Sequence, residues 1–263
     1  MTRMSVLKAA EFLAWARRSG APGGDLPADL APADIEQGYA IQVEAARLRR
    51  AGTAGYKVGL TSAEAQQATG ASAPIAGRLA LADIRRGPAN IALPQKHLRI
   101  VEAEFVFEIG RRIGAENLPL REACIHEHIR TVYAGIEICN SRLSAEDPPL
   151  PAVIADNSYA DLLVIGDAIS NWRAELEKDV SVVLSRRCGA AIHGSSGRVL
   201  GSPARSVVWL ANWLASRGES LECGDFIASG SCTGMTPVAP TDSVVATFGD
   251  AARASVQFES TLG

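Results

Sequence analysis

The segment RIVEAEFVFEIG (residues 99–110) constrains the fold of this chain most, because apolar and acidic residues alternate along it with a period of two. The period predicts a β-strand that turns Glu102, Glu104 and Glu108 to one face. The apolar positions on the other face are Val101, Ala103, Phe105, Phe107 and Ile109. An acidic face that meets water explains the pattern, and so does a divalent cation between Glu102 and Glu104, since Mg²⁺ prefers oxygen ligands. The strand alone leaves both interpretations open.

A third carboxylate lies in the apolar segment VYAGIEICNS (132–141), where Glu137 stands between two isoleucines. A strand glutamate is seldom fully buried, and burying it without a partner would cost several kcal/mol. Glu102, Glu104 and Glu137 together could hold one Mg²⁺ or Mn²⁺. Two ligands from one strand and one from another would leave coordination positions for water and substrate, as a catalytic metal requires.

Two further segments carry polar groups in apolar or glycine-rich surroundings. Lys57 lies in the short apolar strand GYKVGL (55–60). A lysine desolvated near a cation can have its pKa lowered and act as a base, although a strand lysine more often extends its ammonium group to water. The segment GDFIASGSCTGM (224–235) offers backbone N–H groups and the hydroxyls of Ser231 and Thr233, which suit a carboxylate or keto acid.

The order of elements indicates an α+β fold, with helices first and mostly strands after. Helices are predicted at 1–20, 33–51, 119–130 and 202–218, and a capping box formed by Thr61 and Glu64 predicts a short helix that ends at Gly70. In the first half, strands are predicted at 55–60, 90–94, 99–109 and 132–139. In the second half, they are predicted at 161–166, 178–186, 190–193, 225–229, 235–239, 243–248 and 253–258. The glycine motifs that bind dinucleotides or nucleotide phosphates do not occur, so a nucleotide cofactor is unsupported.

Composition narrows the class of protein. The 263 residues carry a net charge of −3 and no stripe of Lys and Arg, which argues against a nucleic-acid partner. Five scattered cysteines suit a reducing compartment. The first helix contains Lys8 and Glu11, unlike a signal peptide, and no apolar run approaches the roughly 20 residues that span a bilayer. We therefore expect a cytoplasmic protein without a membrane segment.

Five segments, taken together and in order, resemble one known family. They are YKVGLTS, EAEFVFEIG, GIEICNSR, ADNSYADLLVIG and LGSPARSVVWLANWLASRGESLECGDFIASGSCTG. The pattern is similar to that of the 2-keto-4-pentenoate (2-hydroxypenta-2,4-dienoate) hydratase and 4-oxalocrotonate decarboxylase family, in the fumarylacetoacetate hydrolase superfamily. The resemblance covers essentially the whole chain.

The resemblance implies a mixed β-roll core with an α-helical N-terminal part. On this basis residues 1–70 form the mainly helical part that includes the Lys57 strand. Residues 71–263 form the catalytic core, and the two make one integrated domain. The resemblance also implies a homo-oligomer and a Mg²⁺ or Mn²⁺ held by Glu102, Glu104 and Glu137.

The implied activity is a divalent-metal-dependent hydratase that adds water to a 2-hydroxy-2,4-dienoate or 2-oxo-4-enoate, as in aromatic meta-cleavage catabolism. Lys57 is then the catalytic residue, and Asn157, Ser231 and Thr233 contact the substrate. Many of the family's hydratases carry an aspartate in a P-D-[FY]-G segment, where it pairs with the lysine, and here Ile75 stands in its place. This departure keeps two alternatives open: a 4-oxalocrotonate-type decarboxylase, and a keto-acid-binding protein without turnover.

Overall fold

A computed structural model describes residues 1–20, 24–93, 99–250 and 252–260. In this part of the chain the α-helices are α1 (Arg3–Ser19), α2 (Ile35–Leu48), α3 (Ala63–Thr69), α4 (Glu122–Ile125), α5 (Leu150–Ala155), α6 (Trp172–Leu176) and α7 (Pro203–Ala215). The first strands are β1 (Gly55–Gly59), β2 (Ile75–Leu79), β3 (Ile84–Arg86), β4 (Ala89–Leu93), β5 (Ile100–Ile109) and β6 (Ile129–Cys139). The later strands are β7 (Ala160–Ala168), β8 (Ser181–Arg186), β9 (Ile192–Ser195), β10 (Phe226–Ala228), β11 (Thr236–Pro237), β12 (Ser243–Phe248) and β13 (Ala252–Ser260).

The first sheet holds the segments that the sequence analysis singled out. Its strand order among the described residues is β2-β1-β10-β5-β6-β7-β3. Strand β11 also pairs with β5, on the same edge as β10 but further along the strand. The β1–β10 and β3–β7 pairs are parallel and the others antiparallel, so the sheet is mixed. The sheet curls, which brings β2 against β7. Both faces of β5 are buried as a result.

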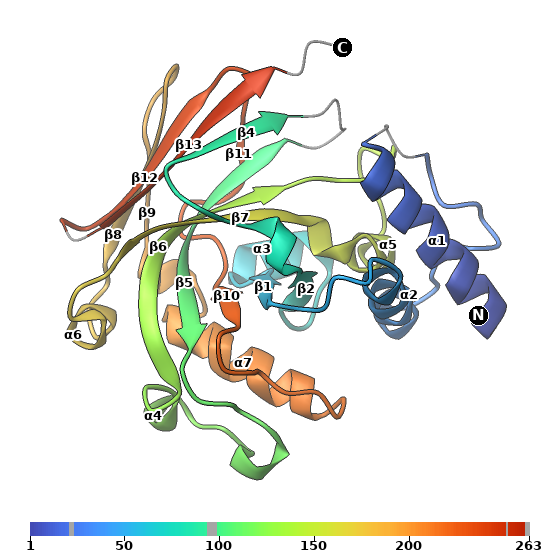
Figure 1. The fold of residues 1–263 in the computed structure, drawn as a ribbon, viewed down its shortest axis with the longest axis horizontal. Helices are drawn as coiled ribbons and strands as arrows, with labels where there is room; N and C mark the ends of the chain where they lie inside the picture. The colour runs from blue at the N-terminus through green and yellow to red at the C-terminus, as the bar shows by residue number, and fades with distance from the viewer. Residues whose placement is uncertain (21–23, 94–98, 251, 261–263) are drawn as a thin grey trace.

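The second sheet packs against the first and forms the main core with it. Its order is β4-β13-β12-β8-β9, and it lies at the upper left of Figure 1. Phe105 of β5 meets Phe248 of β12 edge to face, with ring centroids 4.9 Å apart. The apolar stripe of α7, which includes Val207, Leu210 and Leu214, joins the same core. The predicted mixed β-roll with a helical N-terminal part is confirmed.

The N-terminal helices α1 and α2 lie together with α5 at one side of the molecule (Figure 1). Thr2 caps α1 by accepting a hydrogen bond from the Ser5 backbone, and Asp34 caps α2 in the same way for Gln37. The buried faces of the two helices meet through Ala9, Leu13 and Ile41 in a separate small core. Both predicted helices are confirmed.

Three local predictions were wrong. Ser62, not Thr61, caps α3, because its hydroxyl accepts the hydrogen bond from the Ala65 backbone. The helix predicted over 119–130 is only the four-residue α4, since β6 already begins at Ile129 to pair with β5. Strand β2 and helix α5 lie in segments for which the sequence analysis predicted neither a helix nor a strand.

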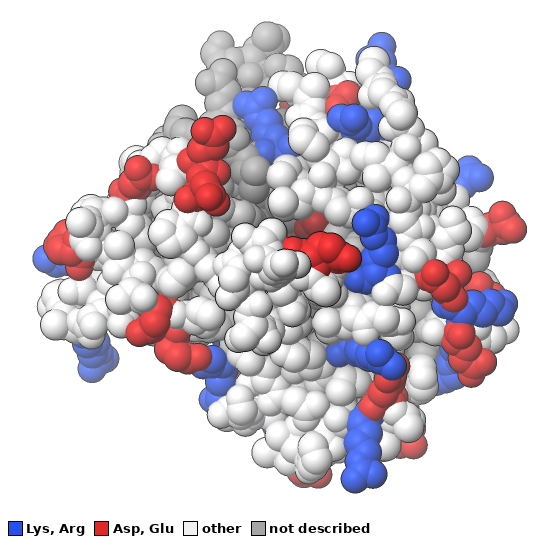
Figure 2. Space-filling view, turned by 180° about the vertical axis from the view of Figure 1, so that it is seen from behind, with Lys and Arg blue, Asp and Glu red and all other residues white. Residues whose placement is uncertain are grey.

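Charged side chains of both signs are interspersed on the face shown in Figure 2. No helix within the described ranges combines the length and apolar character that a membrane-spanning segment needs.

Candidate metal and substrate site

The carboxylate triad (Glu102, Glu104 and Glu137) lies on one face of two adjacent strands. The β5–β6 register places Glu102 directly opposite Glu137, and Glu104 opposite Gly135. Side chains at such positions project side by side. The exposed fractions are 9% for Glu102, 1% for Glu104 and 0% for Glu137. The interpretation of Glu102 and Glu104 as a solvated acidic face is therefore wrong.

Buried carboxylate oxygens in this triad lack hydrogen bonds. The Glu104 Oε2 atom accepts one from the Gly230 N–H at 2.8 Å, whereas its Oε1 and both oxygens of Glu137 accept none from the described residues. Burial, together with the charges of Glu137 and Glu102, raises the pKa of Glu104 well above its usual range. Burial also raises the pKa of Glu137, although Lys57 opposes this shift. Buried carboxylate oxygens without hydrogen bonds, on Glu104 and Glu137, suit a hard divalent cation.

Cys139 is a fourth side chain at this position, and the sequence analysis did not single it out. It lies two residues beyond Glu137 on the same face of β6, and its thiol donates to Glu102 Oε2 at 3.4 Å. Ligand atoms of Glu102, Glu137 and Cys139 lie within 4.8 Å of one another. The two-residue period of the strand was the signal that could have found it. Burial and the two carboxylates raise the pKa of this thiol well above its ordinary value.

Lys57 points into the triad from β1. Its Nζ atom lies 3.5 Å from Glu137 Oε2, and the side chain is 5% exposed. Burial alone would lower the pKa of Lys57, but the negative charges around it, that of Glu137 foremost, outweigh burial and raise it. The charges nearest to Lys57 in this structure are therefore anions, and they favour its ammonium form. The lowered pKa expected of a lysine beside a bound cation stays a prediction.

Two glycines make room for this lysine. In the β1–β2 pairing Lys57 lies opposite Gly77, and Gly59 lies opposite Ile75. A Cβ atom on Gly77 would lie 3.1 Å from Lys57 Cγ, and one on Gly59 would lie 3.3 Å from Nζ. The Lys57 side chain thus passes over Gly77, and its ammonium group lies next to Gly59.

Ile75, which stands where the resemblance to the family implies an acid, borders the end of Lys57. The missing Cβ of Gly59 would lie 3.2 Å from Ile75 Cγ1 and 3.3 Å from Lys57 Nζ, so both groups flank the same point. Ile75 is 5% exposed and packs with Tyr39 and Ile154. The ammonium group therefore has an apolar neighbour where an ion-pair partner was expected.

The loop after β10 follows β5 past the triad. The backbone N–H groups of Ser229 and Cys232 donate to Phe105 and Ala103, which keeps the loop beside Glu104. Gly230 has φ +109°, and a Cβ there would come within 2.3 Å of Thr61 Oγ1, so only glycine fits. The predicted substrate contacts differ in their surroundings. Ser231 Oγ has no hydrogen-bond partner among the described residues, whereas Thr233 Oγ1 accepts one from Ala103 N at 3.4 Å.

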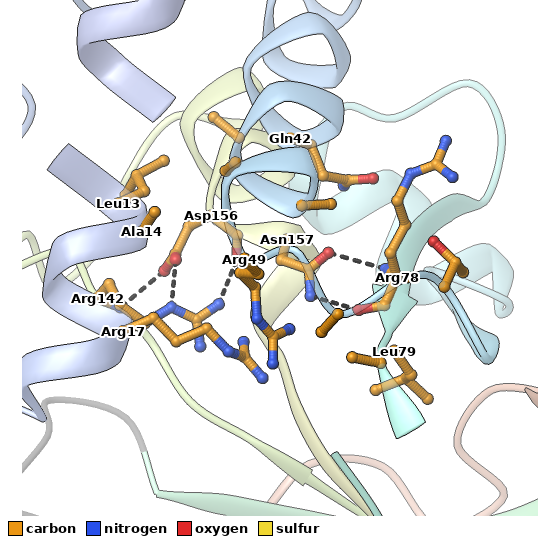
Figure 3. Close-up of a pocket in the computed structure, with 17 residues that line it drawn as sticks. Leu13, Ala14, Arg17, Gln42, Arg49, Arg78, Leu79, Arg142, Asp156 and Asn157 are labelled. Atoms are coloured by element: carbon orange, nitrogen blue, oxygen red, sulfur yellow. Dashed lines mark hydrogen bonds and ion pairs between the residues drawn. The ribbon is translucent and has the colours of Figure 1, made fainter. Parts of the chain in front are cut away.

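Asn157, the other predicted substrate contact, lies beside β2 and lines a pocket (Figure 3). Its amide donates to the Arg78 carbonyl and accepts from the Arg78 N–H, both at 2.8 Å, so its polar atoms are taken by the backbone. Arg17, Arg49 and Arg142 line the same pocket. The structure brings Asn157 together with these arginines and not with the triad.

The arginines beside Asn157 are balanced by aspartates. Arg49 makes two hydrogen bonds of 2.7 Å to Asp83, and Arg17 lies 3.2 Å from the same carboxylate. Arg142 is paired with buried Asp156. These contacts join α1 and α2 to the sheet, and Asp83 has a lowered pKa because its two arginine partners outweigh the effect of burial.

Glu108, the remaining acid of β5, belongs to a different contact network. Its carboxylate pairs with Arg130, and accepts a hydrogen bond of 2.7 Å from the Tyr133 hydroxyl. It is 8% exposed, so it is a structural residue rather than a solvated one.

Curated proteins similar to this chain carry two kinds of name. A "TodF product hydratase" from Pseudomonas putida is 32% identical over 241 residues, which are 90% of this chain and 89% of that protein. The chain belongs to the 2-keto-4-pentenoate hydratase and 4-oxalocrotonate decarboxylase family. A 2-keto-4-pentenoate hydratase from Paraburkholderia xenovorans is 31% identical over 99% of this chain and 97% of its own length. A 4-oxalocrotonate decarboxylase from a Pseudomonas species is 30% identical over 84% of each chain. Both names denote lyases, so the predicted family and enzyme class are confirmed. No family model matches the chain.

Solved structures agree with this assignment. A 4-oxalocrotonate decarboxylase from Pseudomonas putida G7, complexed with magnesium and adipate, superposes with a TM-score of 0.89 at 27% identity over 98% of each chain. A fumarylpyruvate hydrolase from Pseudomonas aeruginosa shares the fold, with a TM-score of 0.61 at 15% identity over 78% of this chain and 89% of its own.

Proposed function

We propose that this protein is a divalent-metal-dependent hydratase that converts a 2-hydroxy-2,4-dienoate or 2-oxo-4-enoate into a 4-hydroxy-2-oxo acid. The observation that carries the proposal is the convergence of the carboxylate triad with Lys57 in one buried site. The triad would hold Mg²⁺, or Mn²⁺, because Glu104 Oε1 and both oxygens of Glu137 accept no hydrogen bond from the described residues. When bound, such an ion draws electron density from the oxygens of a 2-oxo acid and so eases enolate formation.

The side chains around the triad divide the remaining work. Lys57 carries its proton at Nζ, and it would donate a hydrogen bond to the substrate carboxylate or pass that proton to the carbon chain. Ser231 has a free hydroxyl to orient the substrate. Thr233, fixed to the backbone between Glu102 and Glu104, would hold the loop in place. Asn157 would support the site without contacting the substrate, since its amide fixes the Arg78 backbone in β2.

A second candidate reaction is decarboxylation of a 4-oxalocrotonate-type 2-oxo acid. Ile75 favours this reaction. With Ile75 in place of the acid that would pair with the lysine, the site lacks a group that could help to activate water for hydration. Loss of CO₂ requires no activated water. Changing Ile75→Asp separates the two reactions. We expect this variant to hydrate dienoates faster than the natural protein, with no gain in decarboxylation.

The direct test uses purified protein with Mg²⁺, mixed with a panel of 2-hydroxydienoates and 4-oxalocrotonate while ultraviolet absorbance is followed. Loss of dienoate absorbance with formation of a 4-hydroxy-2-oxo acid supports the hydratase, and CO₂ release from oxalocrotonate supports the decarboxylase. Tight binding of oxalate with no turnover of any compound would instead indicate a keto-acid-binding protein. Size-exclusion chromatography with light scattering tests the proposed homo-oligomer, and cell fractionation tests the proposed cytoplasmic location.

A further inference from the structure

Cys139 brings a sulfur donor into a site that is otherwise made of carboxylates. Within the described ranges, the three side chains whose ligand atoms all lie within 4.8 Å of one another are Glu102, Glu137 and Cys139. Glu104 is not part of this group, and its Oε2 atom accepts a hydrogen bond from the Gly230 N–H at 2.8 Å. The donors that meet most closely are therefore two carboxylates and a thiol.

The distance between the thiol and Glu102 suits two ligands of one small ion. Cys139 Sγ lies 3.4 Å from Glu102 Oε2. Zinc bonds of about 2.3 Å to sulfur and about 2.0–2.2 Å to a carboxylate oxygen place two such ligands about 3.5 Å apart in a tetrahedral site. Glu137 precedes Cys139 by two residues on the same face of β6, and neither oxygen of this fully buried carboxylate accepts a hydrogen bond from the described residues. It is therefore suited to be the third ligand.

A divalent ion would change the state of the thiol. In this structure the thiol donates to Glu102, and burial beside two carboxylates raises the pKa of Cys139. A coordinating thiol loses its proton to solvent outright, because the dication replaces the proton as the partner of the sulfur. A thiolate ligand favours Zn²⁺ and similar soft ions, whereas Mg²⁺ prefers oxygen.

We propose that this site also binds a thiophilic divalent ion, such as Zn²⁺, through Glu102, Glu137 and Cys139. Sulfur then takes the place that Glu104 has in the carboxylate triad. Because the two sets of ligands share Glu102 and Glu137, Zn²⁺ and Mg²⁺ exclude each other. The competition with Mg²⁺ rests on the proposed function, whereas the thiophilic site rests on the positions of its own three side chains. Cys139 is thus a determinant of metal selectivity.

The test is titration of the full-length natural protein with Co²⁺, a probe whose thiolate complexes absorb in the near ultraviolet and whose carboxylate complexes do not. We expect a thiolate-to-cobalt charge-transfer band that excess Zn²⁺ removes. Cys139→Ser should abolish the band and weaken Zn²⁺ binding at least about 100-fold in calorimetry, because even residues that only support a metal ligand contribute about 10–100-fold. Its Mg²⁺ affinity should be unchanged, which also shows an intact fold.

Two variants separate the sets of ligands without altering Cys139. Glu104→Gln should weaken Mg²⁺ binding and keep the charge-transfer band. Glu137→Gln should lose the band although every cysteine remains, which excludes cobalt binding at the exposed cysteines, Cys124, Cys188 and Cys223.

The outcomes distinguish this inference from the proposed function. Mg²⁺ binding by the natural protein without a charge-transfer band, or a band that survives Cys139→Ser, would overturn the thiophilic site and leave the proposed function standing. A band that requires Cys139, in a protein that does not bind Mg²⁺, would support the thiophilic site and overturn the magnesium-dependent function.

Discussion

Replacing Gly77 by alanine tests whether the glycines under Lys57 set the geometry of the site. The new Cβ would lie 2.4 Å from the Asn157 carbonyl oxygen, 0.6 Å inside the 3.0 Å limit for such contacts, and 3.1 Å from Lys57 Cγ. Asn157 cannot yield easily, because it and the next two residues all have left-handed φ angles, between 52° and 62°. Overpacking of this kind costs about 1–3 kcal/mol. We therefore expect Gly77→Ala to lower the melting temperature by about 2–10 °C.

The same substitution should reduce turnover by about 10²-fold, since a displacement near 1 Å at a catalytic group can cost that much. Gly59→Ala should lower the melting temperature less and reduce turnover by a smaller factor, because its closest contacts are side-chain atoms at 3.2 and 3.3 Å and not backbone. Gly24→Ala is the control, with only one atom within 4 Å. Steady-state assays and thermal melts measure both effects. Natural turnover and stability in Gly77→Ala would refute the role assigned to these glycines.

Three further predictions concern charges. Changing any member of the carboxylate triad to glutamine should weaken Mg²⁺ binding severely in a metal titration. Glu108→Gln is the control and should barely alter Mg²⁺ binding. Equal effects at all four positions would mean that the triad does not bind the metal. Lys57→Met should lower turnover by ~10²–10⁴-fold while oxalate and Mg²⁺ still bind, so a variant as fast as the natural protein would remove the lysine from the mechanism. Asp83 has a folded-state pKa below its unfolded value of 3.8, so the stability it contributes is present above that pH and is lost as the pH falls through the folded pKa. Asp83→Asn should cost about 3 kcal/mol at pH 7 and flatten this acid dependence in thermal melts.

The sequence predicted the strands of the site better than their arrangement. The two-residue period of β5 identified the face of Glu102 and Glu104, whereas the burial of Glu137 was left open by the sequence and is shown by the structure. Period and composition carry no information on register, however, and it is register that places Glu102 opposite Glu137. The resemblance to the family supplied the link between these two strands.

Other residues took positions that depend on tertiary contacts. The segment around Ile75 contains alanine, proline and glycine, which are typical of a loop, yet it forms the fully buried strand β2. Gly77 permits this because it has no side chain where the Lys57 side chain passes over the strand. Asn157 lies in the family pattern, but its backbone has φ +58° and its amide turns to Arg78. Propensity at either position gives no sign of these contacts.

The position of β5 and β6 in the middle of their sheet has a consequence for hydrogen exchange. Strands β10 and β11 pair with β5 on one side and β7 pairs with β6 on the other, so Glu102 and Glu137 lie inside a sheet that is hydrogen-bonded on both sides. Openings of such central strands approach the free energy of global unfolding, whereas helix ends and loops open in smaller fluctuations. The amide protons of this strand pair should accordingly exchange only through global unfolding. A motion that opens the site is therefore expected in the 229–233 loop, which runs beside Glu104, rather than in these two strands.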